Sequence, residues 1–339
     1  MDSTQPTDHP PCEVGVSSDG RAPIATFVEQ AKAAEAGGAT TIWVACHLFL
    51  RDPVTAAHAA LAATTRIRVA LMAMSPYSVH PVYITMAAAA LDELFPGRVE
   101  LCLGVGAPGD LAAAGIESPL PLTTLREAIR ICRALLTGNT IHHEGQVFKV
   151  SGRRLANPTD RIAITLAASG PKMLELAGAE ADGVLISAAT SIEYIHWCLG
   201  HVEQGRAQRR IAGHCRRMAL VYTSVNDDAC AARDAIRRTM GFILRGPHHA
   251  KNIELAGTRL DRQALWNAYR DEDWQAVERM IGDEVLAAHA AAGTPEAVRQ
   301  RYAAYRAVGL EQVIIGGIDD PAGLARALAA TGMGEAGSR

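Results

Sequence analysis

The strongest constraint on the fold is an alternation of short apolar runs with longer helical patterns along the chain. Eight runs rich in β-branched residues each precede a segment whose apolar side chains recur every three or four residues. The runs are 13–16, 41–45, 67–74, 99–103, 162–166, 184–186, 219–225 and 312–315. Alternating strands and helices build a parallel sheet, and eight such units close into a barrel. The sequence therefore predicts a (β/α)8 TIM barrel, with residues 1–339 in one domain.

Two segments interrupt this alternation. Between 139 and 159 the helical period gives way to alternation about Glu144-Gly145, which predicts a hairpin inserted into the barrel. Between 227 and 292 successive helical patterns exceed a simple strand-to-helix connection, so we expect a helical excursion there. The clearest amphipathic helix ends at Gly138, and one face of it carries Leu125, Ala128, Ile129, Cys132, Leu135 and Leu136.

Charge and cysteine content exclude several classes of partner. The chain has 33 Lys and Arg against 36 Asp and Glu, without a basic run, so nucleic acid is not expected as a partner. Its seven cysteines are scattered without a Cys-x-x-Cys pair, which predicts reduced thiols in the cytoplasm. Residues 1–11 lack the basic and apolar regions of a signal peptide, and no apolar run reaches membrane-spanning length. We therefore expect no membrane partner.

Two histidine pairs invite a metal hypothesis. His142-His143 and His248-His249 have no acidic or cysteine partner at a useful spacing. We expect solvated loop histidines at these positions and no metal site.

His47 and Asp110 are the candidate catalytic residues. In a barrel of this type, catalytic groups lie at the carboxyl ends of strands and in the loops that follow. His47 follows the second predicted strand, where an imidazole can donate a proton or stabilise an oxyanion, although a lone histidine is often structural. Asp110 follows the fourth strand, and it either accepts a hydrogen bond from a cofactor hydroxyl or caps the next helix.

Gly104 and Gly106 follow the fourth strand and formally begin a G-x-G-x-x-G pattern. Pro108 interrupts this pattern, and the acid about twenty residues further on, Glu127, falls inside a helix, which argues against a dinucleotide fold. Without side chains, the two glycines also allow a planar ring system to lie against the strand end.

A second candidate binding segment runs from a strand through a tight turn into a helix. It consists of Ala168, Ser169, Gly170, Pro171, Lys172 and Met173. The first amides of such a helix are unpaired, and with Lys172 beside them they can hold a phosphate. An ordinary Gly-Pro helix start is the alternative interpretation.

The order of several motifs resembles the bacterial luciferase-like family. The motifs are 41–47, 75–81, 91–99 and 103–106. The segment 170–178, followed by 181–186, resembles the coenzyme F420-dependent methylenetetrahydromethanopterin reductase branch of that family. The resemblance covers roughly 14–187 and implies a homodimeric barrel that holds the deazaflavin F420, or alternatively FMN, with its ring at the strand ends.

The resemblance also implies roles for individual residues. Ala73, Met74 and Ser75 would form a bulge behind the ring, where this family often has a non-proline cis peptide. Cys46 and His47 would lie beside the ring, with His47 supplying or stabilising a proton, and residues 168–173 would receive the cofactor phosphate. The expected function is hydride transfer between F420 and a small organic substrate with a carbonyl, an imine or an activated double bond. The alternatives are an FMN-dependent monooxygenase and a catalytically dead barrel that binds a ligand.

Three positions depart from the pattern of this branch. Cys46 stands where the branch has Asp, Ser17 where it has Glu, and Val79 where it often has Arg. Without the two carboxylates, a cationic or amine-bearing reaction centre would lack its acidic partner. The resemblance therefore predicts the cofactor class and not a pterin substrate.

Overall fold

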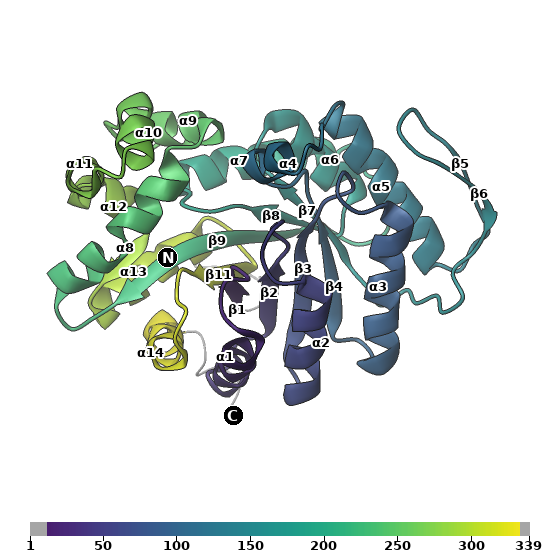
Figure 1. Ribbon diagram of the computed structural model, residues 1–339, viewed down its shortest axis with the longest axis horizontal. Helices are drawn as coiled ribbons and strands as arrows, with labels where there is room; N and C mark the ends of the chain where they lie inside the picture. Colours follow the sequence, from purple (N-terminus) through teal and green to yellow (C-terminus); the bar gives the residue numbers. More distant parts are fainter. Residues whose placement is uncertain (1–11, 333–339) are drawn as a thin grey trace, which may run out of the picture.

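Eight parallel strands close into a barrel at the centre of the protein (Figure 1). The computed structural model describes residues 12–332, so the 1–11 stretch discussed above lies outside the described residues. The strand order is β11-β1-β2-β3-β4-β7-β8-β9, and the parallel pairing of β9 with both β8 and β11 closes the cylinder. The strands are β1 (Glu13–Ser18), β2 (Thr41–Ala45), β3 (Arg68–Met74), β4 (Val99–Leu103), β7 (Ile164–Ala168), β8 (Gly183–Ile186), β9 (Arg216–Val225) and β11 (Gln312–Gly316). The predicted (β/α)8 barrel is confirmed.

Helices between the strands form the outer layer of the barrel (Figure 1). They are α1 (Ile24–Ala36), α2 (Pro53–Ala63), α3 (Pro81–Leu94), α5 (Pro121–Leu136), α6 (Pro171–Glu180), α7 (Ile192–Arg206), α13 (Pro295–Ala307) and α14 (Pro321–Thr331), while the short helix α4 (Pro108–Ala113) lies over the carboxyl ends of the strands. Many begin with proline, whose missing N–H costs nothing in a first helical turn. The apolar stripe predicted for α5 is buried, as expected. Within residues 12–332, no helix has the length and apolarity needed to cross a membrane.

A polar layer closes the amino-terminal end of the barrel interior. It consists of Glu13, Arg68, Glu100, Arg216 and Gln312. Arg68 forms ion pairs with Glu13 at 2.7 Å and with Glu100 at 2.8 Å, while Arg216 lies 3.0 Å from Glu13. Burial favours the neutral form of Glu13, but the guanidinium groups of Arg68 and Arg216 outweigh it and lower the pKa of this carboxyl.

An apolar layer follows above the polar layer. The Trp43 side chain is completely buried, and its indole N–H donates to Gln312 Oε1 at 3.0 Å. It belongs to a cluster with Ala70, Cys102, Leu185, Met218, Leu220 and Ile314. Side chains on alternate residues of each strand face inward, so the barrel is a packed core rather than a pore. The interior leaves no room for a ligand, and in barrels of this type the active site lies at the carboxyl-terminal end of the strands.

The inserted hairpin consists of β5 (Ile141–Glu144) and β6 (Lys149–Arg153), which pair antiparallel. Figure 1 shows it outside the helix layer, beside α5. Glu127 on α5 accepts hydrogen bonds from the N–H groups of Gln146, Val147 and Phe148 at 2.8 to 3.1 Å. Glu127 thus anchors the hairpin. The acid found about twenty residues beyond the glycine-rich segment therefore has a structural role and is not part of a dinucleotide-binding motif.

Residues 227–292 form a helical excursion with a hydrophobic core of its own. Its helices are α8 (Ala229–Leu244), η1 (Pro247–His249), α9 (Ala250–Leu255), α10 (Arg262–Arg270), α11 (Trp274–Met280) and α12 (Asp283–His289). The sequence pattern predicts only helices here, but a short strand, β10 (Ala291–Gly293), pairs parallel with the end of β9. Ala-Ala-Gly contains no β-branched or aromatic side chain, so local propensity does not indicate this strand.

The 91–99 motif has a structural explanation. The carboxylate of Asp92 is fully buried and accepts hydrogen bonds from the Gly97 N–H, the Thr159 hydroxyl and the Arg161 guanidinium. The Arg98 guanidinium donates to three backbone carbonyls and one hydroxyl in residues 61–67. This motif holds the turn between α3 and β4 and takes no part in the candidate site.

Candidate functional site

His47 and Asp110 meet at the carboxyl-terminal end of the barrel. His47 lies two residues beyond β2, and Asp110 lies in the first turn of α4, which follows β4. His47 Nδ1 is 3.5 Å from Asp110 Oδ2, which is within ion-pair range but longer than a good hydrogen bond. The side chains are 45% and 38% exposed. In the described part of the chain nothing bonds to His47 Nε2, so this atom is free to exchange a proton with a ligand.

The end of β3 is irregular. The peptide bond between Met72 and Ala73 is cis, and the register of β3 against β4 shifts between Leu71 and Met74. Ser75, which is only 6% exposed, donates from its hydroxyl to the Val105 carbonyl at 2.6 Å. The predicted bulge segment thus turns back and is tied to the loop after β4.

Small residues form a floor at this end of the barrel interior. A Cβ atom on Gly104 would lie 2.8 Å from Ala73 Cβ and 3.4 Å from Ala167 Cβ, so glycine allows the two strand ends to approach. Gly106 has a φ of +94°, and a Cβ atom there would contact Ser75 at 3.3 Å. The floor formed by Ala73, Gly104 and Ala167 carries no large side chain, so a planar ring can lie flat on it.

The two positions that lack the expected carboxylates carry neutral groups. The Cys46 sulfur lies 3.3 Å from Met74 Sδ, and burial, assisted by the charge of Asp52, raises the pKa of its thiol. The Ser17 hydroxyl donates to the Ile315 carbonyl at 3.2 Å. Neither residue supplies a negative charge to a ligand.

The start of α6 differs in one respect from the expectation of several free amides. Gly170 is the N-cap residue, and its carbonyl accepts hydrogen bonds from the N–H groups of Met173 and Leu174 at 3.0 Å each. Because Pro171 has no N–H, Lys172 provides the one unpaired amide of this first turn among the described residues. The Lys172 side chain is exposed, and a Cβ atom on Gly170 would meet nothing within 4 Å. This turn is therefore an open corner with a free amide and a lysine.

Comparison with known proteins identifies the family. The sequence profile described as luciferase-like monooxygenase matches residues 8–312. The chain belongs to this family. A 5,10-methylenetetrahydromethanopterin reductase of Archaeoglobus fulgidus is 30% identical over 294 residues, which cover 84% of this chain and 87% of that protein. The resemblance inferred from residues 170–186 is thus confirmed.

Two solved structures share the fold of this luciferase-like chain. The F420-dependent tetrahydromethanopterin reductase of Methanopyrus kandleri superposes with a TM-score of 0.86 at 21% identity, covering 95% of this chain and 98% of that one. An F420-dependent secondary alcohol dehydrogenase, in complex with an F420-acetone adduct, has a TM-score of 0.80 at 18% identity and covers 96% and 99% of the two chains. These likenesses show the fold, while the family membership shows that the chain is an enzyme of the oxidoreductase class.

Sequence reasoning missed two tyrosines that border the site of this luciferase-like barrel. Tyr222 of β9 follows Met218 and Leu220 at steps of two, so it faces the barrel interior, and its ring packs against Gly317. Burial raises the pKa of Tyr222 to about 12, so the phenol stays neutral and can donate a hydrogen bond. Tyr194 of α7 donates to the Ser169 carbonyl at 2.6 Å. The alternation along β9 is a signal that could have identified Tyr222.

The loop after β8 is held by a buried network, which we call the rim network, of Asn252 and His289 from the excursion and Tyr305 from α13. The loop residues Ala188 and Ala189 have positive φ angles of 24° and 55°. The Ala189 carbonyl accepts hydrogen bonds from Asn252 Nδ2 at 2.7 Å and from His289 Nδ1 at 3.0 Å. The Tyr305 hydroxyl donates to the next carbonyl along the chain at 3.0 Å. The helical excursion therefore supports one edge of the barrel mouth.

The histidine pairs fall into different environments. His142 and His143 lie on strand β5 and not in a loop, and His143, which is half-buried, lies with Nε2 3.5 Å from Glu127 Oε2, while His142 is exposed. His249 is only 4% exposed, so the expectation of a solvated histidine is wrong at this position, because the excursion folds around its own core. Burial, with the nearby charge of His248, lowers the pKa of His249 to about 3. Across residues 12–332, no group of three or more His, Cys, Asp or Glu side chains is placed to hold a metal ion.

Proposed function

We propose that this protein transfers a hydride between coenzyme F420 and a small organic substrate that carries a carbonyl, an imine or an activated double bond. The observation that carries the proposal is the meeting of His47 and Asp110 beside the floor of small residues. The cofactor class is supported by the Archaeoglobus fulgidus relative, which matches over most of its length.

The residues present fit a bound deazaflavin. The floor of Ala73, Gly104 and Ala167 offers a flat surface for a planar ring, and the open corner at Gly170 and Lys172 offers a cation and a free amide for a phosphate. When bound, F420 would supply a hydride donor or acceptor at its ring. The same surfaces would also accommodate FMN.

The residues of this chain would then manage the proton that accompanies the hydride. His47 would give a proton from Nε2 to a carbonyl oxygen during reduction, or take it from a hydroxyl during oxidation, while Asp110 orients the imidazole through Nδ1. The neutral phenol of Tyr222, which faces the barrel interior, is available as a hydrogen-bond donor to a ligand.

The neutral groups at Cys46 and Ser17 favour a neutral substrate. A cationic or amine-bearing reaction centre gains from a nearby carboxylate, and these two positions provide none. A carbonyl or alcohol has no such requirement, so we infer a small carbonyl compound or alcohol rather than a pterin.

The first experiment is a calorimetric titration of the purified protein with F420, FMN and NADH in separate runs. We expect tight binding of F420 alone. Binding of FMN in preference to F420 would replace this proposal with oxygen chemistry of the monooxygenase type. If none of the three bound, the chain would be a ligand-binding barrel without redox activity.

Two variants test the assigned roles. His47→Ala should lower the rate of hydride transfer by about a hundredfold to ten-thousandfold, with F420 affinity unchanged. Lys172→Glu should weaken F420 binding, whereas Lys149→Glu on the exposed hairpin should not. A His47→Ala enzyme as fast as the parent, or a Lys172→Glu protein with unchanged affinity, would refute the corresponding role.

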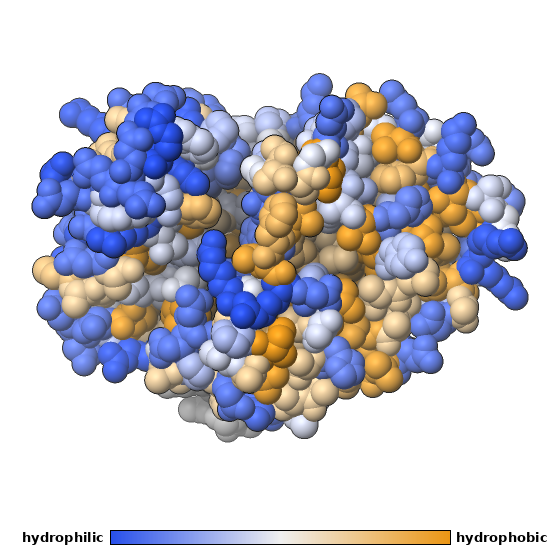
Figure 2. All heavy atoms as spheres, viewed as in Figure 1, coloured by the Kyte–Doolittle hydropathy of each residue, from blue (hydrophilic) through white to orange (hydrophobic). Residues whose placement is uncertain are grey.

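We also propose a cytoplasmic homodimer. Helix α3 exposes Tyr83, Met86 and Leu94, which are 67%, 45% and 63% accessible, and Figure 2 shows hydrophobic side chains gathered over this side of the molecule. The seven cysteines are free thiols, as is typical of proteins from a reducing compartment. Light scattering and cell fractionation test the two parts of this proposal.

A further inference from the structure

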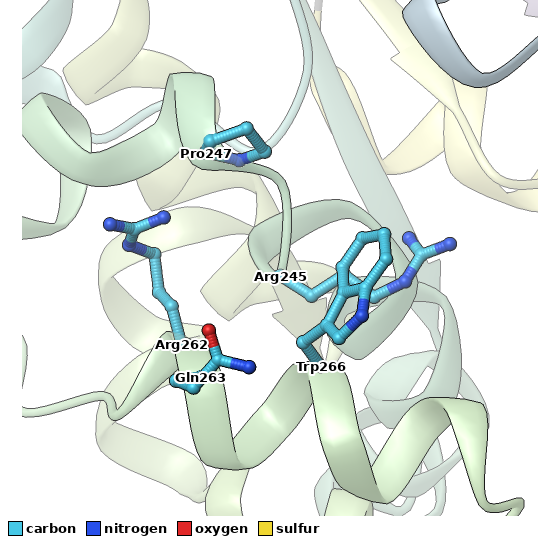
Figure 3. Close-up of a pocket in the computed structure, with 5 residues that line it drawn as sticks. All are labelled: Arg245, Pro247, Arg262, Gln263 and Trp266. Atoms are coloured by element: carbon cyan, nitrogen blue, oxygen red, sulfur yellow. The ribbon is translucent and has the colours of Figure 1, made fainter. Parts of the chain in front are cut away.

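A surface pocket lies on the helical excursion, between the end of α8, η1 and the start of α10 (Figure 3). Its volume is about 340 Å³, and its lining residues are Arg245, Pro247, Arg262, Gln263 and Trp266. This volume falls within the range of small-molecule sites. None of these residues belongs to the proposed hydride-transfer site, so the pocket requires an explanation of its own.

The charge of this pocket is not compensated. Elsewhere in the excursion, Arg238 pairs with Glu278 at 2.7 Å and Arg270 pairs with Asp271 at 2.7 Å. In contrast, the described residues place no carboxylate within ion-pair distance of Arg245 or Arg262. Two arginines that line one pocket without a carboxylate partner create a positive potential that favours an anion.

The positive charge of Arg262 affects the pKa of a neighbouring side chain, His248. Burial lowers the pKa of His248, and the positive charge of Arg262 lowers it further. Burial also lowers the pKa of Arg245, which has no anionic partner to offset the cost. The effect on His248 is in the direction expected of an uncompensated positive charge at Arg262.

Arg245 is fixed in an aromatic cluster. Its guanidinium carbon lies 4.1 Å from the ring centre of Phe242, 4.6 Å from that of Tyr269 and 5.0 Å from that of Trp266. One of its nitrogens donates to the Phe242 carbonyl. A cation in this position fixes the indole of Trp266, which nevertheless remains 44% exposed.

The lining groups are arranged around the pocket with complementary chemistry. Figure 3 shows the Arg262 guanidinium and the Trp266 indole on opposite sides, with Pro247 and Gln263 between them. A planar guanidinium binds a carboxylate through two parallel hydrogen bonds, and an exposed indole offers a face for a ring. One ligand satisfies both groups only if it carries a carboxylate and a ring a few ångströms apart.

We propose that this pocket binds a small aromatic carboxylate, with its carboxylate against Arg262 and its ring against Trp266. The ring would also contact Pro247, and the Gln263 side chain would lie beside the carboxylate. This site goes beyond the proposed redox function, and ligand binding here requires no bound cofactor.

Calorimetry on the full-length protein tests the proposal with 2-naphthoate as the probe. We compare it with 2-naphthamide, which has the ring without the charge, and with acetate, which has the charge without the ring. The expected result is binding of 2-naphthoate at least about tenfold tighter than binding of either comparison compound, a difference of about 1.4 kcal/mol, because each comparison compound lacks one of the two contacts.

Matched variants locate the site. Arg262→Gln should weaken 2-naphthoate binding by about tenfold or more, and Trp266→Leu should weaken it similarly. Arg238→Gln removes another excursion arginine that stacks on a tryptophan, Trp274, outside the pocket, and it should leave the affinity unchanged. Arg262→Lys, which keeps the charge, provides a second test if Trp266→Leu fails to fold, and it should weaken binding less than Arg262→Gln.

Several outcomes would overturn the proposal. Equal affinity for 2-naphthoate and 2-naphthamide would exclude the arginine contact, and equal affinity for acetate would exclude the aromatic contact. Unchanged binding by Arg262→Gln, or no binding of 2-naphthoate at all, would reject the site. If the parent protein bound 2-naphthoate but not F420, only the redox proposal would be rejected. If it bound F420 but not 2-naphthoate, only the pocket proposal would be rejected.

Discussion

Acidification should destabilise this protein through the buried histidines of the excursion. His289 is fully buried, with Nδ1 3.0 Å from the Ala189 carbonyl and Nε2 3.0 Å from the Thr258 hydroxyl. A carbonyl can only accept, so Nδ1 carries the proton and Nε2 accepts from the hydroxyl, which defines a neutral imidazole. Burial lowers the pKa of His289 from 6.5 to about 4, because the charged form would lose its water shell.

The sign and size of the effect follow from proton linkage. The unfolded chain protonates His289 below about pH 6.5, whereas the folded protein keeps it neutral until about pH 4. The contribution to stability is therefore complete above pH 6.5 and is lost as the pH falls toward 4. Between pH 7 and pH 5 one such histidine lowers the free energy of unfolding by about 2 kcal/mol. His249, with a pKa of about 3, adds a similar amount.

Urea unfolding followed by circular dichroism at pH 7 and pH 5 measures this effect. His289→Asn keeps a donor near the Ala189 carbonyl and removes the titrating group, so its loss of stability on acidification should be about 2 kcal/mol smaller than that of the parent. His196→Asn, at an exposed position of α7, is the matched control and should behave as the parent does. Equal acid losses for the parent and His289→Asn would refute the reasoning.

Four further predictions concern packing and assembly. Gly104→Ala should cost about 1–3 kcal/mol in urea unfolding and weaken F420 binding, because the added Cβ would lie 2.8 Å from Ala73 Cβ. Asp92→Ala should cost about 3 kcal/mol by the same assay, since it leaves the Arg161 guanidinium and two other donors without their acceptor. Met86→Glu should convert the proposed dimer to a monomer in light scattering. Scanning calorimetry should show a single unfolding transition, because we propose that barrel and excursion form one domain.

Each of these predictions has a control or a contrary result. Gly109→Ala adds a Cβ that would meet nothing within 4 Å and should be nearly neutral, so equal losses for both glycine variants would contradict the packing argument. Val147→Glu places a charge on an exposed apolar residue of the hairpin and should not change the oligomeric state. An Asp92→Ala protein as stable as the parent would show that its buried carboxylate contributes nothing. Two separated calorimetric transitions would reject the single domain.

The barrel could be predicted from sequence because its signals are local. Strand β2 is apolar from its second residue to its end, and α5 carries an apolar stripe, so residues within a few positions of one another reveal both elements. Strand β7 spans Ile164–Ala168 instead of the predicted 162–166, and the sequence pattern missed its end because its last two residues are alanines without a β-branched signal. The strand β10 has no local signal at all, since its pairing with β9 alone defines it.

The site was predictable only in part. His47 and Asp110 could each be chosen from their place after a strand, and the closure of the barrel brings them together. The rim network could not be predicted, because Asn252 and His289 lie 63 and 100 residues from their shared acceptor. The number of free amides at α6 depends on how the Gly170 carbonyl is used, and sequence spacing does not reveal it.

The polar layer at the base of the barrel has a consequence for folding. Its charged residues come from β1, β3, β4 and β9, and the ion pairs that Arg216 of β9 makes with Glu13 and Glu100 form only when β9 closes the cylinder. A slip of one residue in any strand would turn its charge outward among the helices, without a partner. The polar layer therefore destabilises a barrel that closes with a shifted strand register. Only in the native register does every charge of the layer have an opposite charge beside it.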